Sequence, residues 1–300
     1  MRPLQKLRES LPGWSRRGLP VSLAVLAIAL VTAASASAAA EKINKADFAK
    51  FINCPIESAT FCQYGETTSG EIKLGSGKAV PITNPSILQG GLAFPARYAL
   101  PVIPPRFGAE ELQRSPETVP GGLTGLTEVI GGEVKATAEQ AGTIEVNGAS
   151  LGEGEDSTAV VLPIKVHLEN ENLGPNCYVG SDEEPIELHL TTGTTHPPAG
   201  TEPISGFKGA QPGKDHGKLL TFLGTSLVDN TFAVPAAKGC GTNALLEPVI
   251  TAAVNTAEGL PAEPGKSYAI LNGNNYATLS TWVVKYDKKL LREKEHPKTK

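Results

Sequence analysis

Three groups of residues in this 300-residue chain have types and spacings that chemistry could use. The first, Gly148-Ala149-Ser150-Leu151-Gly152, fits the G-x-S-x-G pattern of a serine hydrolase and follows the strand-like segment 143–146. A nucleophile at Ser150 would need a strand-to-helix turn, but an acidic run begins at Glu153 and would disfavour an oxyanion. We interpret the segment as a glycine-rich turn between two strands, with a hydrolase that uses Ser150 as the alternative.

The second group, Gly265-Lys266-Ser267 with Gly259 upstream, resembles a phosphate-binding loop. Five residues separate Gly259 from Gly265, whereas the loop requires four. Pro261 and Pro264 also remove backbone N–H groups that such a loop would direct at phosphate. The segment is therefore predicted to be a turn before a strand at 267–271.

The third group consists of His167-x-Glu169 and Glu187-x-His189, on the polar faces of two predicted strands. If the strands pair, these four side chains could bind zinc or supply a general acid and base, the second route to a hydrolase. Alternation alone already places polar residues on a solvated face, so we predict no metal and no cofactor. The nearby run 182–184 lacks the alternating oxygen ligands of a calcium loop and is predicted to be a charged turn.

The chain holds four cysteines, Cys54, Cys62, Cys177 and Cys240. Their even number predicts two disulfides in an exported protein. Three pairings can be drawn, and we favour Cys54–Cys62 with Cys177–Cys240 because the first two share one short proline-containing loop. Zinc is the rival interpretation, but no pair has C-x2-4-C spacing.

Residues 1–40 have the pattern of a secretory signal peptide. A basic start precedes an uncharged run at 21–34 and a stretch of small residues at 34–40. The uncharged run is 14 residues long, whereas a transmembrane helix needs about 20, so cleavage should leave no transmembrane span. Ser15-Arg16-Arg17-Gly18-Leu19 resembles a twin-arginine signal, and Sec export stays open as well.

Charge is distributed unevenly along the chain. Residues 41–284 carry 15 basic and 27 acidic side chains, a net charge of −12, while residues 285–300 form a basic tail of net charge +4. An acidic body argues against nucleic acid as a partner, because phosphate neutralisation needs a basic face. The tail could dock on an anionic cell-envelope polymer, or it could be a solvated end.

The periodicity predicts an all-β fold resembling a β-sandwich, with many short strands, long irregular loops and one short helix. We expect an N-terminal β and irregular half at 41–125 with a disulfide loop, and a β-sandwich at 126–284, as one domain or two packed halves. Segment 41–52 fits a short helix or a strap, and 95–125 an irregular crossing. A helix is predicted at 245–257, a hairpin at 71–82, and strands at 127–138, 143–146, 160–168, 186–190, 218–227, 232–234, 267–271 and 278–286.

Several short blocks of the sequence resemble an uncharacterised exported protein family of high-GC Gram-positive bacteria. They are scattered over 53–273 and include Asn53-Cys54-Pro55, Val166-His167-Leu168-Glu169-Asn170, Asn176-Cys177-Tyr178-Val179-Gly180-Ser181, Gly239-Cys240-Gly241 and Ala269-Ile270-Leu271-Asn272-Gly273. The resemblance implies an exported location and no particular activity. From the export signal, the even number of cysteines, the acidic β-rich body and the failure of each catalytic motif, we expect a secreted or cell-envelope-associated protein that binds a ligand or has a structural role without catalysis. The alternative is a secreted hydrolase.

Overall fold

The computed structural model describes residues 43–93, 98–123, 125–126, 131–154, 156–288 and 292. All of them belong to one compact unit, Glu41–Lys300. The predicted signal peptide at 1–40 and most of the basic tail, at 289–291 and 293–300, lie outside the described residues.

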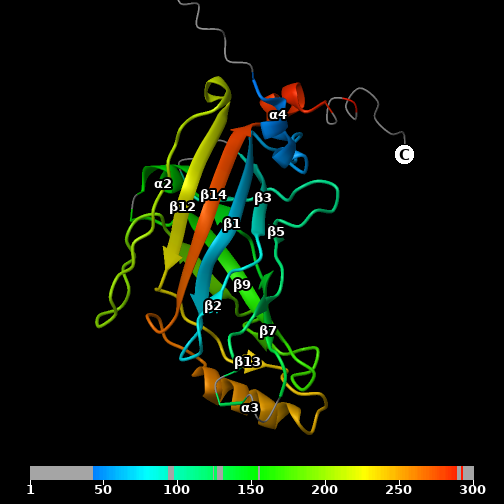
Figure 1. Cartoon of the computed structure of the whole chain (residues 1–300), viewed down its shortest axis with the longest axis vertical. Coiled ribbons are helices and arrows are strands. Elements are labelled where there is room, and N and C mark those ends of the chain that lie inside the picture. The colour runs from blue at the N-terminus through cyan, green and yellow to red at the C-terminus, as the bar shows by residue number, and fades with distance from the viewer. Residues whose placement is uncertain are drawn as a thin grey trace, which may run out of the picture. The chain divides into compact units, whose positions relative to one another are not determined.

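Two antiparallel sheets make up most of this unit (Figure 1). The first has six strands in the order β12-β14-β1-β3-β5, with β2 beside β1. Its strands are β1 (Phe61–Lys73), β2 (Val80–Pro81), β3 (Ser86–Leu92), β5 (Leu112–Gln113), β12 (Leu219–Asp229) and β14 (Tyr268–Leu279).

The second sheet has eight strands in the order β13-β10-β9-β7-β6; β11 and β8 also pair with β9, and β4 pairs with β8. Its strands are β4 (Leu100–Pro101), β6 (Glu117–Thr118), β7 (Lys135–Gln140), β8 (Glu145–Val146), β9 (Val160–Glu169), β10 (Tyr178–Val179), β11 (Ile186–Leu190) and β13 (Ala237–Lys238). The predicted all-β, sandwich-like fold is therefore confirmed.

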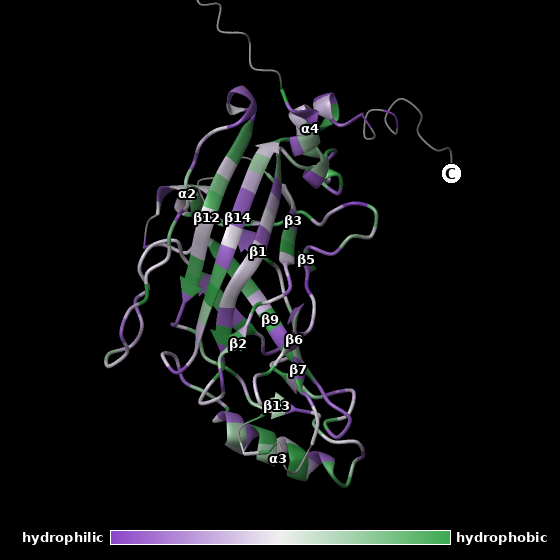
Figure 2. Ribbon diagram, viewed as in Figure 1, coloured by the Kyte–Doolittle hydropathy of each residue, from purple (hydrophilic) through white to green (hydrophobic). Residues whose placement is uncertain are grey.

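The main core lies where β9 and β11 face the first sheet. β11 alternates between buried and exposed residues, as the sequence pattern predicts, and β9 alternates between buried and half-buried residues except at the buried run 162–164. Ile164, Ile186 and Leu188 are almost fully buried. Hydrophobic residues are frequent in β9, whereas much of β14 is pale or hydrophilic (Figure 2). The hydrophobic contact between the sheets is therefore concentrated around the central strand of the second sheet.

The longest pairing joins strands from opposite ends of the chain. β1 and β14 pair from Phe61 opposite Leu279 to Lys73 opposite Tyr268, with an irregularity between Thr67 and Ser69. Just beyond it, Gly70 has φ +128, and a Cβ there would collide with the Ile270 carbonyl, so glycine is required. The predicted hairpin is also present, since Ile72 pairs with Val80.

The helices differ from the prediction in number and place. The predicted helix is present as α3 (Glu247–Glu258), with a proline in its first turn and Gly259 as its left-handed C-cap. The prediction of one helix is wrong, because α2 (Gly148–Glu153) and α4 (Ser280–Tyr286) are helical too. Segment 41–52 contains a 3-10 helix, η1 (Lys45–Phe51), and a second one, η2 (Asp215–Gly217), precedes β12.

Helix α4 replaces the second half of a predicted strand. Its aromatic and β-branched residues favour a strand locally, but the helix buries Val283 completely and packs the Tyr286 ring 5.0 Å from that of Phe48. Tertiary packing thus overrides local propensity. The predicted strand 232–234 is reduced to a bridge between Val234 and Ala262, and β7 begins only at Lys135, although 127–130 lie outside the described residues.

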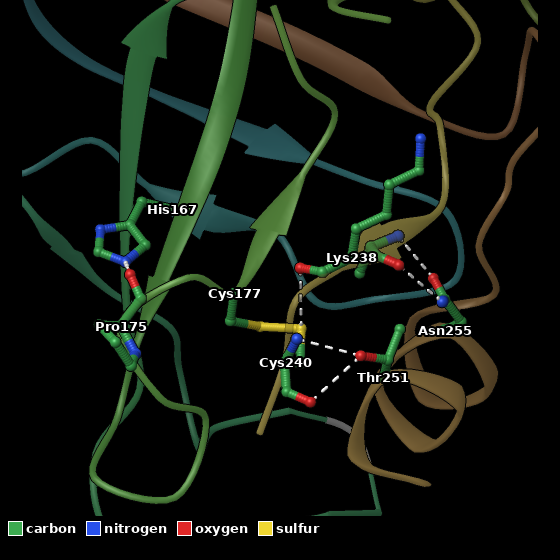
Figure 3. The surroundings of a disulfide bond; sticks show 8 residues. His167, Pro175, Cys177, Lys238, Cys240, Thr251 and Asn255 are labelled. Carbon is green, nitrogen blue, oxygen red and sulfur yellow. Dashed lines mark hydrogen bonds between the residues drawn. A yellow bond between two sulfur atoms is a disulfide. The ribbon is translucent and has the colours of Figure 1, made fainter. Parts of the chain in front are cut away.

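Both favoured disulfides are present, Cys54–Cys62 and Cys177–Cys240. The second joins the segment before β10 to the loop that leads to α3 (Figure 3). Thr251 of α3 accepts a hydrogen bond from the Cys240 N–H at 3.0 Å and donates one to its carbonyl at 3.1 Å. The Asn255 amide pairs in the same way with the backbone of Ala237, so the bridge and two side chains together fix α3 to the end of the second sheet.

The disulfide Cys54–Cys62 belongs to a second, smaller core at the start of β1. Phe51, Cys54, Cys62, Leu219 and Val283 form this cluster and bring η1, α4 and the start of β12 together. Among the described residues, no helix is long and apolar enough to cross a membrane.

Candidate functional site

A cavity of about 150 Å³ lies between the two sheets. Its wall is apolar and comes from both: the first sheet and its β1–β2 turn supply Ile72, Leu74, Val80 and Leu271, and the second supplies Ala136, Ala138, Leu162, Ile164, Val166 and Leu188. Protein interiors are close-packed, and an engineered apolar cavity of about this volume stays dry and binds benzene. The space is therefore large enough for a small apolar group.

The small residues of β7 help to leave this space open. Ala136 pairs with Leu168 and Ala138 pairs with Val166, so both alanines share the inward face of the sheet with larger neighbours. Each alanine has only a methyl group where the neighbouring strand presents a branched side chain. Side chains consequently leave a space between the sheets along β7, beside the well-packed residues of β9.

Polar residues gather where the cavity wall reaches solvent. Lys78, Asn84 and Ser115 line the cavity and are exposed, which marks this side as the opening. The Glu117 carboxylate accepts hydrogen bonds from the backbone N–H groups of Thr83 at 2.9 Å and Asn84 at 2.7 Å. The charged groups at the opening are thus largely engaged with the protein.

Arg114 has a partner as well, since its guanidinium lies 2.7 Å from the carboxylate of Glu110. Within the described residues, the ionisable groups of the cavity wall are Lys78, Arg114, Glu117 and Glu258, two of each charge. An opening with balanced charge and an apolar interior suits a neutral or weakly polar ligand better than an ion.

Ser150 lies away from this cavity and in an unexpected conformation. The prediction of a glycine-rich turn is wrong, because residues 148–153 form α2, capped by the Asn147 side chain, which accepts from the N–H groups of Ala149 and Ser150. Two features of the sequence indicate this helix: Asn147 as its N-cap, and Gly154 as its left-handed C-cap with φ 73.

The helix does not make Ser150 a nucleophile. Its side chain is 2% exposed, and its hydroxyl lies 2.7 Å from the hydroxyl of Ser157. Among the described residues, its hydrogen-bond partners include no histidine. A serine hydrolase needs an accessible hydroxyl beside a general base, and the described surroundings of Ser150 provide a buried hydroxyl beside another hydroxyl.

The segment Gly265-Lys266-Ser267 forms the predicted turn before a strand. Gly265 has φ 85, and Ser267 is 2% exposed and accepts a hydrogen bond of 2.9 Å from the N–H of Gly75. This turn therefore fixes the β1–β2 hairpin to the start of β14.

The four candidate metal ligands do not meet in one place. His189 of β11 pairs with Val161 of β9, six residues before His167 on the same strand. At about 3.3 Å per residue, the two histidines lie about 20 Å apart along the sheet. Among the described residues, no group of three or more histidine, cysteine or acidic side chains could hold a metal ion.

Each histidine has local partners instead. The His167 ring stacks on Tyr178 with centroids 4.5 Å apart, and its Nδ1 lies 3.5 Å from Glu169. His189 Nε2 lies 2.8 Å from Glu187 on its own strand. The predicted charged turn is also present, since Asp182 pairs with Lys165 at 2.8 Å and Glu184 with Lys238 at 3.0 Å.

Comparison of the chain with protein-family models, curated proteins and solved structures finds no match.

Proposed function

We propose that this chain is an exported binding protein that holds a small apolar molecule, or the hydrocarbon end of a larger one, between its two sheets. The observation that carries this proposal is the apolar cavity of about 150 Å³, with exposed Lys78, Asn84 and Ser115 at its opening. A concave apolar space with a few polar groups at one side is the usual form of a small-molecule site.

Export is supported by the signal-peptide pattern of residues 1–40 and by two disulfides, which persist in oxidising compartments. The resemblance to an exported family points the same way. We further propose that the protein is held at the cell envelope, where the basic residues of 285–300 contact an anionic polymer.

Binding without catalysis fits the side chains that are available. The Ser150 hydroxyl is buried against Ser157. His167 and His189 lie far from each other, and each contacts a glutamate on its own strand. The cavity wall itself is built mainly from aliphatic residues, which offer contact area and no nucleophile. These features favour a carrier or receptor of an apolar ligand over a hydrolase.

Fluorescence of N-phenyl-1-naphthylamine, a neutral apolar dye, tests this function on the disulfide-bonded protein. We expect a saturable rise with one dye per chain, reversed by the neutral competitor 1-decanol. Ala138→Leu should weaken dye binding about tenfold, because a misfitting methylene group costs about 1–3 kcal/mol in a filled space. Ala252→Leu, on the exposed face of α3, adds the same atoms outside the cavity and serves as the control.

If Ala138→Leu binds the dye as tightly as the control Ala252→Leu, the dye binds outside the cavity and the proposed site is contradicted. Absence of saturable binding to the unmodified protein would contradict the proposed function itself.

A further inference from the structure

An aromatic and basic surface lies at the end of the protein where η1 and α4 meet. Trp282 and Tyr286, one turn apart on α4, stack with ring centroids 5.7 Å apart and an interplanar angle of 14°. The Lys218 ammonium lies 5.2 Å from the Trp282 ring centroid, and that of Lys285 lies 5.1 Å from it. We call Lys218, Trp282, Lys285 and Tyr286 the Trp282 surface.

The residues of this surface come from two segments distant in sequence, α4 and the residue before β12, and η1 packs beside them. The N-cap residue Asn44 of η1 donates its backbone N–H to the Asp215 carboxylate of η2 at 2.8 Å. Thr278, just before α4, donates its hydroxyl to the Lys218 carbonyl at 2.6 Å. Figure 1 shows η1 beside α4, with the start of β12 close by. Lys218 is therefore placed beside the indole by the tertiary fold, whereas Lys285 lies one turn from Trp282 on the same helix.

The charge at this end is predominantly positive. Lys45, Lys214, Lys285 and Lys288 are exposed, whereas Asp47 is half-buried and Asp215 and Asp287 are 5% and 8% exposed. Within the described residues, neither Lys218 nor Lys285 forms an ion pair with a carboxylate. Both ammonium groups instead lie against aromatic rings, which restrict them without neutralising their charge.

A neighbouring lysine extends the same basic region. The Lys50 ammonium lies 3.2 Å from the ring centroid of Tyr276 on β14. Burial lowers the pKa of Lys50, and the charge of Lys214 lowers it as well, while Asp47 and Glu66 act in the opposite direction. An approaching anion would relieve the repulsion between the two lysines.

We propose that the Trp282 surface binds a linear polymer that carries repeated phosphate groups. This inference deepens the proposed retention at the cell envelope and rests on it. Ammonium groups are strong phosphate partners as point charges, and their fixed positions lower the entropy lost on binding. The rest of the body is acidic, so a polyanion is repelled elsewhere and is directed to this end.

Binding to immobilised long-chain polyphosphate tests this assignment on the full mature chain. Lys218→Gln with Lys285→Gln should weaken binding at least about tenfold, since each lysine near an anionic surface adds about 1 kcal/mol. The slope of log affinity against log salt should fall by about 2. Lys218→Arg with Lys285→Arg keeps both charges and should bind as the unmodified protein does.

Two matched variants separate the surface from the tail. Lys208→Gln with Lys266→Gln removes the same charge from exposed positions elsewhere and should change affinity less than twofold. Lys294→Gln, Lys298→Gln and Lys300→Gln together reduce the charge of the tail alone. Loss of binding in this tail variant but not in the Trp282-surface variant would overturn the inference and leave retention by the tail intact.

If none of the variants changes affinity, both the surface and the tail proposals fail. Tighter binding to vesicles of anionic phospholipid than to polyphosphate would overturn the polymer assignment. Equal near-ultraviolet circular dichroism of all variants checks that each substitution leaves the packing around Trp282 unchanged.

Discussion

The phenol of Tyr268 on β14 donates a hydrogen bond of 2.6 Å to Oε1 of Glu71 on the neighbouring strand β1. This hydrogen bond, followed by burial and the negative charge of Glu71, raises the pKa of Tyr268 to about 12. The protonated phenol is thus favoured in the folded protein.

The Tyr268 pair predicts a loss of stability at high pH. Because the folded pKa lies above the ordinary value of 10.0, this contribution is fully present below pH 10 and disappears as the pH rises through about 12. Ultraviolet titration of phenolate absorbance should show a late ionisation that Tyr268→Phe removes and Glu71→Gln moves to lower pH. An unchanged titration curve in Glu71→Gln would contradict the assigned cause.

The two disulfides should contribute unequally to stability. They close loops with sequence separations of 8 and 63 residues, for which loop-closure entropy gives about 2.6 and about 4.3 kcal/mol. Urea unfolding of Cys177→Ala with Cys240→Ala should therefore show a larger loss than Cys54→Ala with Cys62→Ala. The opposite order would mean that packing around the small core dominates over loop length.

Substitution of Asp229, at the end of β12, should destabilise the protein more than substitution of most other polar residues. Its fully buried carboxylate accepts hydrogen bonds from the His189 N–H at 2.6 Å and from the N–H and hydroxyl of Thr231, each at 2.7 Å. Asp229→Ala leaves these donors without their acceptor and should lower the free energy of unfolding by about 3 kcal/mol. Urea unfolding measures this loss.

Asp156 provides the comparison for that experiment. It accepts one backbone hydrogen bond of 2.7 Å from Thr194, but its side chain is 55% exposed. Water can replace the lost acceptor, so Asp156→Ala should cost less than about 1 kcal/mol. Similar losses for Asp156→Ala and Asp229→Ala would show that burial is not what makes Asp229 important.

The cavity predicts opposite outcomes for two alanine substitutions in the sandwich. Ala138 lines the cavity, so Ala138→Leu has room and should leave the melting temperature unchanged or raise it. Ala269 is fully buried and outside the cavity wall, so Ala269→Leu should destabilise the protein by about 1–3 kcal/mol. Thermal unfolding followed by circular dichroism compares the two. Equal destabilisation would contradict an open space beside β7.

The local sequence pattern predicted the structure correctly where the alternation of residues reflects which side of a strand is buried. The alternation of 160–168 and 186–190 predicted β9 and β11, because a half-buried strand must alternate to separate core from solvent. Cysteine number and loop length favoured the pairing that the structure contains. The pattern was misleading at 280–286, where a β-prone sequence forms α4 to cover the small core.

Sequence by itself determined the fold class, the main strands of the second sheet and the helix α3, since each depends on periodicity or composition. It also favoured one of three possible disulfide pairings from the spacing of the cysteines. Only the tertiary structure decided that His167 and His189 are far apart, because strand register sets which residues meet. The cavity likewise exists only where β7 presents Ala136 and Ala138 toward the opposite sheet. Lys218 reaches Trp282 only because distant segments pack together, whereas Lys285 lies one turn away from Trp282 on the same helix.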